Sequence, residues 1–226
     1  MNDYSELEQS LGIVFRDKSL LQRALIHRSY LNEHPNFPLE DNERLEFLGD
    51  AVLDYVVGEW LFERYPDARE GELTGLRARI VRTEGLAQFA NEISLGDMLR
   101  LGHGEAASGG RERAANLCAA FEALVGAISR DQGIAIARTW VLAFLNRHAS
   151  ETDSQRMDKD PKSRLQEYTQ AELKSTPTYR IVSDDGPDHA KTFVAQVLVK
   201  RKVWGEGSGC SKQAAEQAAA EDAVTN

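Results

Sequence analysis

The spacing of hydrophobic residues changes once along the chain. From Ser5 to about His148, apolar residues recur every three or four positions and no stretch alternates with a period of two, as in helices packed on one face. This pattern predicts an all-α domain over residues 1–149. The expected helices span residues 5–11, 18–30, 43–64, 72–92, 94–100, 114–130 and 133–148.

A different pattern follows this domain. Residues 150–160 are polar and nearly free of apolar side chains, as in a linker. Residues 161–226 predict a small α+β domain with the order α-β-β-β-α, because a helical pattern is followed by three short alternating segments and an alanine-rich helix. The expected helices span residues 162–173 and 211–224, and the expected strands span residues 179–182, 192–199 and 202–207.

Composition narrows the class of protein. Charged residues make up 28% of the chain and apolar residues 42%, as in ordinary globular domains. No apolar run approaches the roughly 18 residues of a membrane span, and the acidic residues 1–6 do not resemble a secretory signal, so we expect a cytoplasmic protein. Cys118 and Cys210 are too few for a disulfide framework and are not spaced for zinc, so both are expected to be reduced thiols.

The net charge of −9 argues at first against a nucleic-acid partner, because phosphate binding normally requires a basic surface. The charge is unevenly distributed, however. Residues 158–226 carry 10 Lys and Arg against 11 Asp and Glu, whereas residues 1–157 carry 17 against 25. The excess of acid therefore lies in the helical domain.

Four acids share one face of the helix expected over residues 43–64. Glu43, Glu46, Asp50 and Asp54 fall within an arc of roughly 80°, opposite the apolar residues of the same helix. A column of this kind is often only a solvated face. Here Gly49, Ala51 and Gly58 would permit close approach by neighbouring helices, so we expect the acids to lie in a partly enclosed cleft.

Glu122 is the only charged residue in the apolar segment 114–128. An unpaired buried carboxylate costs several kcal/mol, so a partner is expected. One possibility is an arginine, with Arg77, Arg79 and Arg82 as candidates. The other is a divalent cation, Mg2+ or Mn2+, shared with Glu46 and Asp50, because such ions prefer oxygen ligands.

These residues stand in segments that resemble bacterial ribonuclease III. The resemblance rests on residues 42–50 (NERLEFLGD), preceded by HRSY at residues 27–30 and followed by EGEL at 70–73 and FEALVG at 121–126. The C-terminal domain resembles a double-stranded-RNA-binding domain, so the likeness covers nearly the whole chain.

The resemblance implies a homodimeric endoribonuclease that cuts both strands of double-stranded RNA in a valley between two nuclease domains. It implies 5′-phosphate and 3′-hydroxyl products, and a role in processing ribosomal and other RNA. Glu46, Asp50 and Glu122 are implied as metal ligands, with Mg2+ as the cofactor and Mn2+ as a substitute. Glu43 and Glu70 are implied as further catalytic members of the acidic cluster.

One position departs from the family pattern. The family usually has an aspartate three residues before the glutamate of the second helix, where this chain has Ala119. We expect a weaker metal site, and Asn116, one turn earlier, is a candidate for a replacement ligand. The alternative function is a double-stranded-RNA-binding protein whose nuclease domain is weakened or inactive.

The resemblance also implies the RNA contacts of the C-terminal domain. Gln166 and Glu167 would enter one minor groove, His189 the next, and Ser211 and Lys212 would face phosphates at a helix N-terminus. Many relatives have a lysine where this chain has Gln213. Further backbone contacts are expected from residues among Lys191, Lys200, Arg201, Lys202, Arg111 and Arg113.

Overall fold

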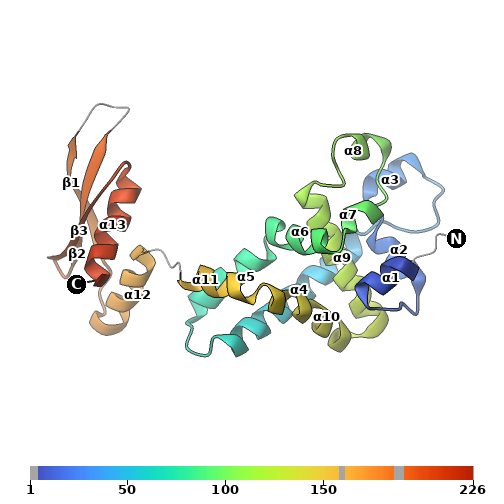
Figure 1. Cartoon of the computed structure of the whole chain (residues 1–226), viewed down its shortest axis with the longest axis horizontal. Helices are drawn as coiled ribbons and strands as arrows, with labels where there is room; N and C mark the ends of the chain where they lie inside the picture. Colours follow the sequence, from blue (N-terminus) through green and yellow to red (C-terminus); the bar gives the residue numbers. More distant parts are fainter. Residues whose placement is uncertain (1–4, 158–160, 186–190, 226) are drawn as a thin grey trace. The chain divides into compact units, whose positions relative to one another are not determined.

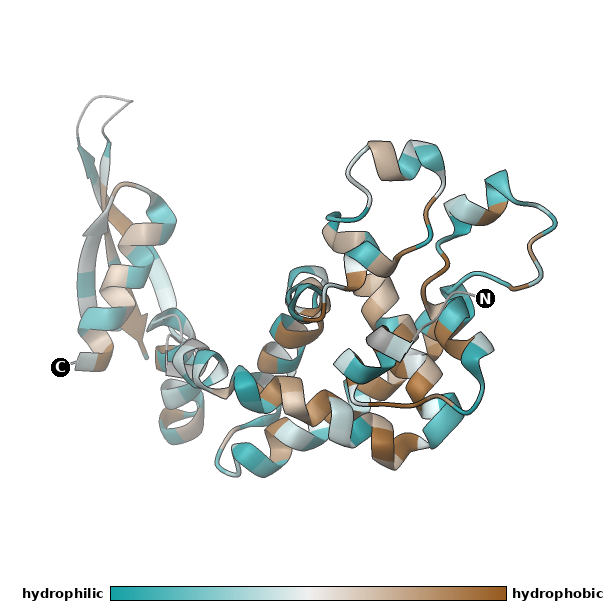
Figure 2. Cartoon of the chain, turned by 45° about the vertical axis from the view of Figure 1, so that its right-hand side comes forward, coloured by the Kyte–Doolittle hydropathy of each residue, from teal (hydrophilic) through white to brown (hydrophobic). Residues whose placement is uncertain are grey.

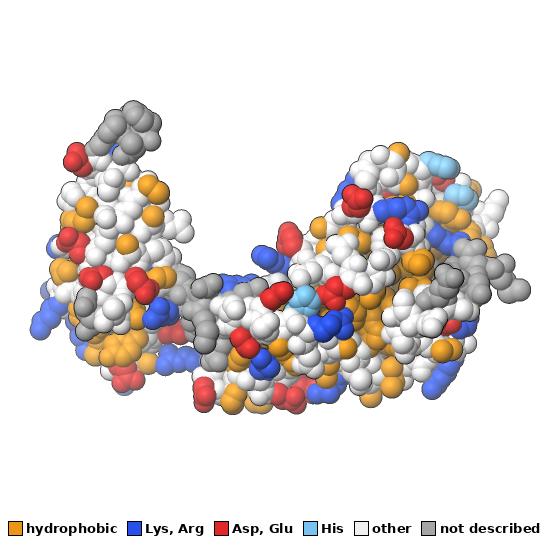
Figure 3. All heavy atoms as spheres, viewed as in Figure 1, with side chains coloured by type: hydrophobic (Ala, Val, Ile, Leu, Met, Phe, Trp, Pro, Cys, Tyr) orange, Lys and Arg blue, Asp and Glu red, His pale blue; other side chains and the backbone are white. Residues whose placement is uncertain are grey.

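The computed structural model describes residues 5–157, 161–185 and 191–225. The chain divides into two compact units, residues 1–152 and 153–226, which are described separately below (Figure 1). Charged side chains are spread over the surface of both, with hydrophobic side chains between them (Figure 3). No helix in the described part of the chain is long and apolar enough to cross a membrane.

The first unit is built only of helices, as predicted. Its core forms where the helices meet, and hydrophobic residues concentrate there (Figure 2). The helices are α1 (Ser5–Leu11), α2 (Lys18–Ala24), α3 (Arg28–Glu33), α4 (Glu43–Arg64), α5 (Glu70–Val81), α6 (Thr83–Glu92), α7 (Leu95–Met98), α8 (His103–Ala107), α9 (Ala114–Gln132) and α10 (Ile134–Arg147).

Helix α9 forms the centre of this unit. Its residues from Ala123 to Ile128 are all buried, and it contacts α2, α4, α6 and α10. Phe121 packs against Phe89 of α6 and Phe144 of α10, with ring centroids 5.7 and 5.3 Å apart. A charged residue on this helix is therefore held in a fixed position within an apolar surrounding.

Two helices expected to be continuous are each divided. The helix predicted over residues 18–30 is interrupted because Ile26 pairs with Arg100, and the His27 N–H donates to the Arg100 carbonyl at 3.1 Å. Arg82 interrupts the helix predicted over residues 72–92, because its backbone is extended and serves as the cap of both α5 and α6. Helix α8 lies in a segment where no helix was predicted.

The second unit contains a three-stranded antiparallel sheet of order β1-β2-β3 between two helices in sequence. Helix α13 packs on β2 and β3 and contacts α12, and the core includes Leu165, Val197 and Ala219. This is the predicted α-β-β-β-α fold. The elements are α12 (Pro161–Leu173), β1 (Thr178–Asp185), β2 (Thr192–Val199), β3 (Lys202–Gly209) and α13 (Lys212–Thr225).

The polar segment between the two domains is helical over most of its length. Helix α11 spans Ala149–Met157, in the segment for which the sequence predicted a polar linker and no helix. The segment contains no Gly or Pro to interrupt a helix. Thr152 is buried and its hydroxyl donates to the His148 carbonyl at 3.3 Å. The polar composition of this segment therefore did not mean that its backbone is irregular.

Candidate active site

Helices α4 and α9 are in direct backbone contact where they cross. A Cβ atom added to Gly49 would lie 1.7 Å from the carbonyl oxygen of Glu122, and one added to Gly126 would lie 2.2 Å from that of Leu45. Only glycine fits at either position. The crossing places Glu122 beside the acidic face of α4, as expected from Gly49. Gly58 serves no comparable contact, and Ala51 is exposed.

The crossing brings three carboxylates into mutual repulsion. Burial, together with the negative charges of Asp50 and Glu46, raises the pKa of Glu122 to about 7. Burial also raises the pKa of Glu46, with added contributions from Glu43, Asp50 and Asp41. These shifts show that protein groups do not neutralise the negative charge at the crossing.

No arginine compensates Glu122 within the described residues. Arg77 Nε lies 3.8 Å from Asp54, and Arg82 Nε lies 3.6 Å from Glu84. The hydrogen bond that Glu122 accepts comes from Cys118, whose Sγ is 3.7 Å from Glu122 Oε1. The structure therefore does not support the alternative of an arginine partner.

The carboxylates fit a divalent cation by their chemistry. In the conformation seen, no three Asp, Glu, His or Cys side chains of the described residues converge tightly enough to hold an ion. Glu46 is half-buried and Asp50 is exposed, and neither forms an ion pair in this part of the chain. A divalent cation shared by these carboxylates would relieve the repulsion that raises the pKa values.

Cys118 is the polar neighbour of Glu122 on α9. Burial and the adjacent Glu122 charge raise the pKa of its thiol to about 12. Cys118 is thus a protonated hydrogen-bond donor and a poor nucleophile. Both cysteines of the chain are free.

The remaining predicted residues of this site are distributed around it. Glu43 is exposed and its Oε1 lies 3.5 Å from Arg28 Nη1. Glu70 opens α5 and accepts a hydrogen bond from Thr74 at 3.1 Å, but it is not among the charges that raise the pKa of Glu46 or Glu122. The crossing therefore brings Glu43, Glu46, Asp50 and Glu122 together, and it leaves Glu70 at a separate helix start.

Asn116 does not replace the acid that is missing at Ala119. Its amide Nδ2 donates to Glu105 Oε1 at 2.7 Å and to the Gly110 carbonyl at 2.9 Å. These bonds hold the side chain toward α8 and the segment that follows it. The expectation of Asn116 as a metal ligand is therefore not supported, and Ala119 remains without a substitute.

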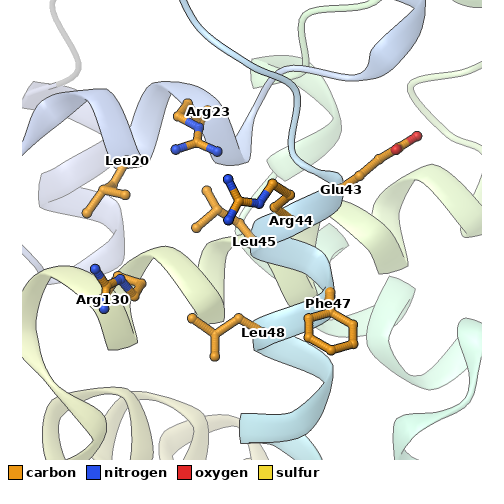
Figure 4. Close-up of a pocket in the computed structure, with 8 residues that line it drawn as sticks. All are labelled: Leu20, Arg23, Glu43, Arg44, Leu45, Phe47, Leu48 and Arg130. Atoms are coloured by element: carbon orange, nitrogen blue, oxygen red, sulfur yellow. The ribbon is translucent and has the colours of Figure 1, made fainter.

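A groove lies beside the first turns of α4, and the sequence did not predict it (Figure 4). Its volume is about 670 Å³. Phe47 at its rim is 81% exposed, and Tyr55 and Phe62 further along α4 are also exposed. Their spacing places them on one stripe of α4, apart from the buried residues of the helix. This stripe of exposed apolar residues is the feature of the sequence that could have predicted the groove. The lining residues are Leu20, Arg23, Glu43, Arg44, Leu45, Phe47, Leu48 and Arg130.

The predicted RNA contacts of the second unit lie on α12 and at the start of α13. Gln166 is exposed and Glu167 half-buried on α12. Ser211 and Lys212 are exposed, and Ser211 Oγ accepts the Ala214 N–H at 3.1 Å as the cap of α13. His189 lies outside the described residues.

The two arginines suggested as extra RNA contacts of the nuclease unit are used within the fold. Arg111 Nη1 donates to three backbone carbonyls at the end of α7, at 2.9 to 3.0 Å. Arg113 pairs with Glu105. These internal contacts leave both residues less suited to binding phosphates.

Each of the two units matches a known protein family. Residues 17–148 match the family described as Ribonuclease-III-like, and residues 161–226 match the double-stranded RNA binding motif. Ribonuclease 3 of Dehalococcoides mccartyi is 46% identical over 224 residues, covering 99% of this chain and 94% of that relative. Ribonuclease 3 of Oceanobacillus iheyensis is 47% identical over 225 residues, covering 98% and 97%.

A solved structure agrees with the first unit. The ribonuclease III nuclease domain of Campylobacter jejuni is 42% identical with a TM-score of 0.59, and the match covers 64% of this chain and 97% of that one. The chain therefore belongs to the ribonuclease III family, the metal-dependent endoribonucleases in which a helical nuclease domain is joined to a double-stranded-RNA-binding domain.

Proposed function

We propose that this chain hydrolyses the phosphodiester bonds of double-stranded RNA at the crossing of α4 and α9, with Glu46, Asp50 and Glu122 as the ligands of Mg2+. Mn2+ would substitute, because it shares the preference for oxygen ligands. The observation that carries the proposal is Glu122, a half-buried carboxylate that faces two other acids and has no basic partner among the described residues.

The three carboxylates would supply oxygen ligands from two helices whose spacing is fixed by Gly49 and Gly126. When bound, the divalent cation makes water a stronger nucleophile near neutral pH and offsets negative charge on the phosphate. Cys118 donates to Glu122 and limits the orientations of that carboxylate. The proposed products carry 5′-phosphate and 3′-hydroxyl ends.

Glu43 and Glu70 are proposed as outer catalytic members of the acidic cluster. Both are exposed. Glu43, whose charge raises the pKa of Glu46, would act through water near the cation, whereas Glu70, at the start of α5, would act from outside the crossing. Ala119 lies on the same helix one turn before Glu122 and provides no carboxylate, so we propose a weaker affinity for the cation. Loss of nuclease function is not favoured, because the other acids of the cluster are present.

We propose that the enzyme acts as a homodimer. The stripe of Phe47, Tyr55 and Phe62 on α4 exposes apolar surface that a second copy could cover, and the groove beside Phe47 offers a concave surface. The solved Campylobacter jejuni structure concerns flexibility in a region involved in dimer formation. Analytical ultracentrifugation of Phe47→Asp would test this, with a monomer as the expected result.

For the second unit, we propose that Gln166, Glu167, His189, Ser211 and Lys212 contact the RNA. Exposed polar side chains on α12 suit the hydroxyl-rich minor groove, and the α13 N-terminus with Lys212 suits phosphates. Recognition would depend on duplex shape. Processing of ribosomal and other RNA in the cytoplasm remains a prediction that follows from the family.

Incubation of the purified chain with a long RNA duplex and Mg2+ tests the proposed function. The wild type should cut the duplex, and Glu122→Ala should bind the duplex without cutting it. Binding without cleavage by the wild type, across a range of Mg2+ and Mn2+ concentrations, would overturn the activity. Cleavage that survives in Glu122→Ala would show that the site lies elsewhere.

A further inference from the structure

Four basic residues gather at one end of the second unit. Lys200 and Arg201 form the two-residue turn between β2 and β3, and Lys202 is the first residue of β3. Lys174 directly follows α12, four residues before β1 begins opposite Leu198 of β2. All four side chains are exposed. We call this group the basic turn end.

The basic turn end lies at one end of the sheet, and the start of α13, where Ser211 and Lys212 are proposed to bind RNA, follows the opposite end. Val199 pairs with Lys202 beside the turn, whereas Phe193, at the other end of β2, pairs with Gly209. Gly209 is followed within three residues by Lys212. The eight residues of β2 separate the two ends by roughly 25 Å. The basic turn end is therefore a separate surface from Ser211 and Lys212.

The backbone at the basic turn end is costly for the residues it carries. Lys174, Lys200 and Arg201 have φ values of 48°, 48° and 65°. A two-residue hairpin turn with both φ positive favours Asn-Gly, and the position after a helix favours Gly. The exposed side chains gain no burial that would offset this cost. Packing therefore gives no reason for basic residues at these positions.

The positive charge at this end has no internal counterpart. No ion pair within the described residues involves any of these four side chains. Acids on the adjacent helix and strand are engaged elsewhere, since Glu221 Oε2 lies 3.5 Å from Arg164 and Glu206 accepts from Gln196 at 2.6 Å. Glu172, in the last turn of α12, forms no ion pair with the described residues.

We propose that the basic turn end binds RNA backbone phosphates beyond the stretch of duplex covered by α12 and the start of α13. A group of unpaired cations on an acidic chain attracts polyanions, and the double-stranded RNA binding motif brings phosphates to this domain. Contacts with phosphates need no sequence readout and require only exposed, flexible cations. The inference rests on RNA binding by this unit, so it can fail while the proposed nuclease site stands.

The variant Lys200→Asn/Arg201→Gly separates folding from charge. It removes two cations while installing the preferred turn sequence, so the melting temperature of the full chain should stay the same or rise by roughly 5 °C. RNA affinity is measured in EDTA, to prevent cleavage, over a range of salt concentrations. On a 40-base-pair duplex the affinity should fall roughly fivefold to tenfold, and the slope of log K against log salt should shrink by about two.

Two controls locate the contact. Lys200→Arg/Arg201→Lys keeps both charges and should bind as the wild type does. A duplex of about 16 base pairs fills the domain's ordinary footprint, so its first binding event should be equally tight in all variants. With this short duplex in excess, a further outcome is that the wild type binds a second copy that Lys200→Asn/Arg201→Gly does not bind. That result would show that the basic turn end binds the phosphates of a second RNA molecule, and it would also support the proposal.

Unchanged affinity and salt slope on the long duplex, with no second short duplex lost, would overturn the proposal. An equal loss in the first binding of both duplexes would also overturn it, because the turn would then lie inside the ordinary footprint. The wild type could instead bind immobilised polyglutamate while the variant does not, with RNA binding unchanged. That result would overturn the proposal and assign the surface to acidic peptides.

Discussion

Two groups of acids in the nuclease unit differ in how their charge is neutralised. At the α4–α9 crossing, Glu46, Asp50 and Glu122 face one another without a basic partner in the described residues, and burial and mutual repulsion raise the pKa of Glu122. At the junction of α10 and α11, Glu92 pairs with Arg147 at 2.8 Å and with His148. Burial alone would raise the pKa of Glu92, but these two partners lower it.

The difference shows which group has its countercharges within the fold. Glu92 has its countercharges within the fold, and His148 also contacts Glu151 at 3.1 Å, so this group fastens α6 to α10 and α11. The crossing keeps its negative charge although arginines lie on nearby helices. A cluster that keeps uncompensated charge at a structural cost is typical of a functional site, and here the missing partner would be a cation from solution.

The largest expected effect tests the close approach that creates the crossing. Gly49→Ala should destabilise the protein by about 3 kcal/mol or more, because its Cβ would lie 1.7 Å from the Glu122 carbonyl oxygen and the helices must separate. The matched control is Gly58→Ala, because a Cβ at this position meets no atom closer than 4.0 Å. This variant should be more stable than the wild type by up to roughly 1 kcal/mol. Urea unfolding measures both, and similar stabilities would refute the close contact.

The next effect tests the uncompensated charge directly. Because the folded-state pKa of Glu122 is raised from 4.5 to about 7, the metal-free fold loses stability as the pH rises from 4.5 to about 7, and the full loss is present above pH 7. Glu122→Gln should therefore be more stable than the wild type at pH 8, by about 1 to 2 kcal/mol after allowance for partial exposure. At pH 5 this advantage should vanish. Urea unfolding in EDTA at both pH values decides, and an advantage of equal size at pH 5 would exclude the electrostatic cause.

A third change adds the missing acid. Ala119→Asp places a carboxylate one turn before Glu122 on the same face of α9. If the crossing holds a cation, this variant should bind Mn2+ up to roughly tenfold more tightly, or about 1.4 kcal/mol. Asn116→Ala serves as the comparison, since Asn116 is bonded to Glu105 and Gly110 and should leave Mn2+ affinity unchanged. Calorimetric titration measures both, and no gain from the aspartate would place the cation elsewhere.

The smallest effect concerns the group of Glu92, Arg147 and His148. Its pH dependence is opposite to that of Glu122, because the contribution of His148 is favourable at low pH and is lost at high pH. Burial would lower the pKa of His148, but Glu92 and Glu151 raise it above 6.5. Its contribution to stability is thus fully present below pH 6.5 and is lost as the pH rises through the folded-state pKa. His148→Gln should cost about 0.5 kcal/mol at pH 6 and less at pH 9. Thermal unfolding at both pH values measures this, and a larger cost at pH 9 would contradict the assignment.

The sequence predicted the fold where local periodicity determines it. Helix α4 and strand β2 have the expected bounds, because their apolar residues keep one period throughout. The interruption at Ile26 depends on Arg100, which lies far along the chain, and local periodicity does not contain that information. Helix α11 was missed because its residues are polar, although nothing in them prevents a helix.

The candidate site was predictable from one isolated charge. Glu122 in an apolar segment required a partner, and Gly49 indicated the close approach that brings α4 to it. The orientation of Asn116 was not predictable, because Glu105 and Gly110, which hold it, come from another helix and its following segment. The groove beside Phe47 depends on side chains from α2, α4 and α9 and needed the assembled fold.

The most direct test of the account is a titration of Mn2+ into the metal-free full chain without RNA, followed by electron paramagnetic resonance. Wild type and Glu92→Gln should bind the ion equally, because Glu92 has its partners within the fold. Glu122→Gln should bind it at least roughly tenfold more weakly. Equal affinity in Glu122→Gln and the wild type, or a loss confined to Glu92→Gln, would contradict the claim that the crossing of α4 and α9 holds the cation.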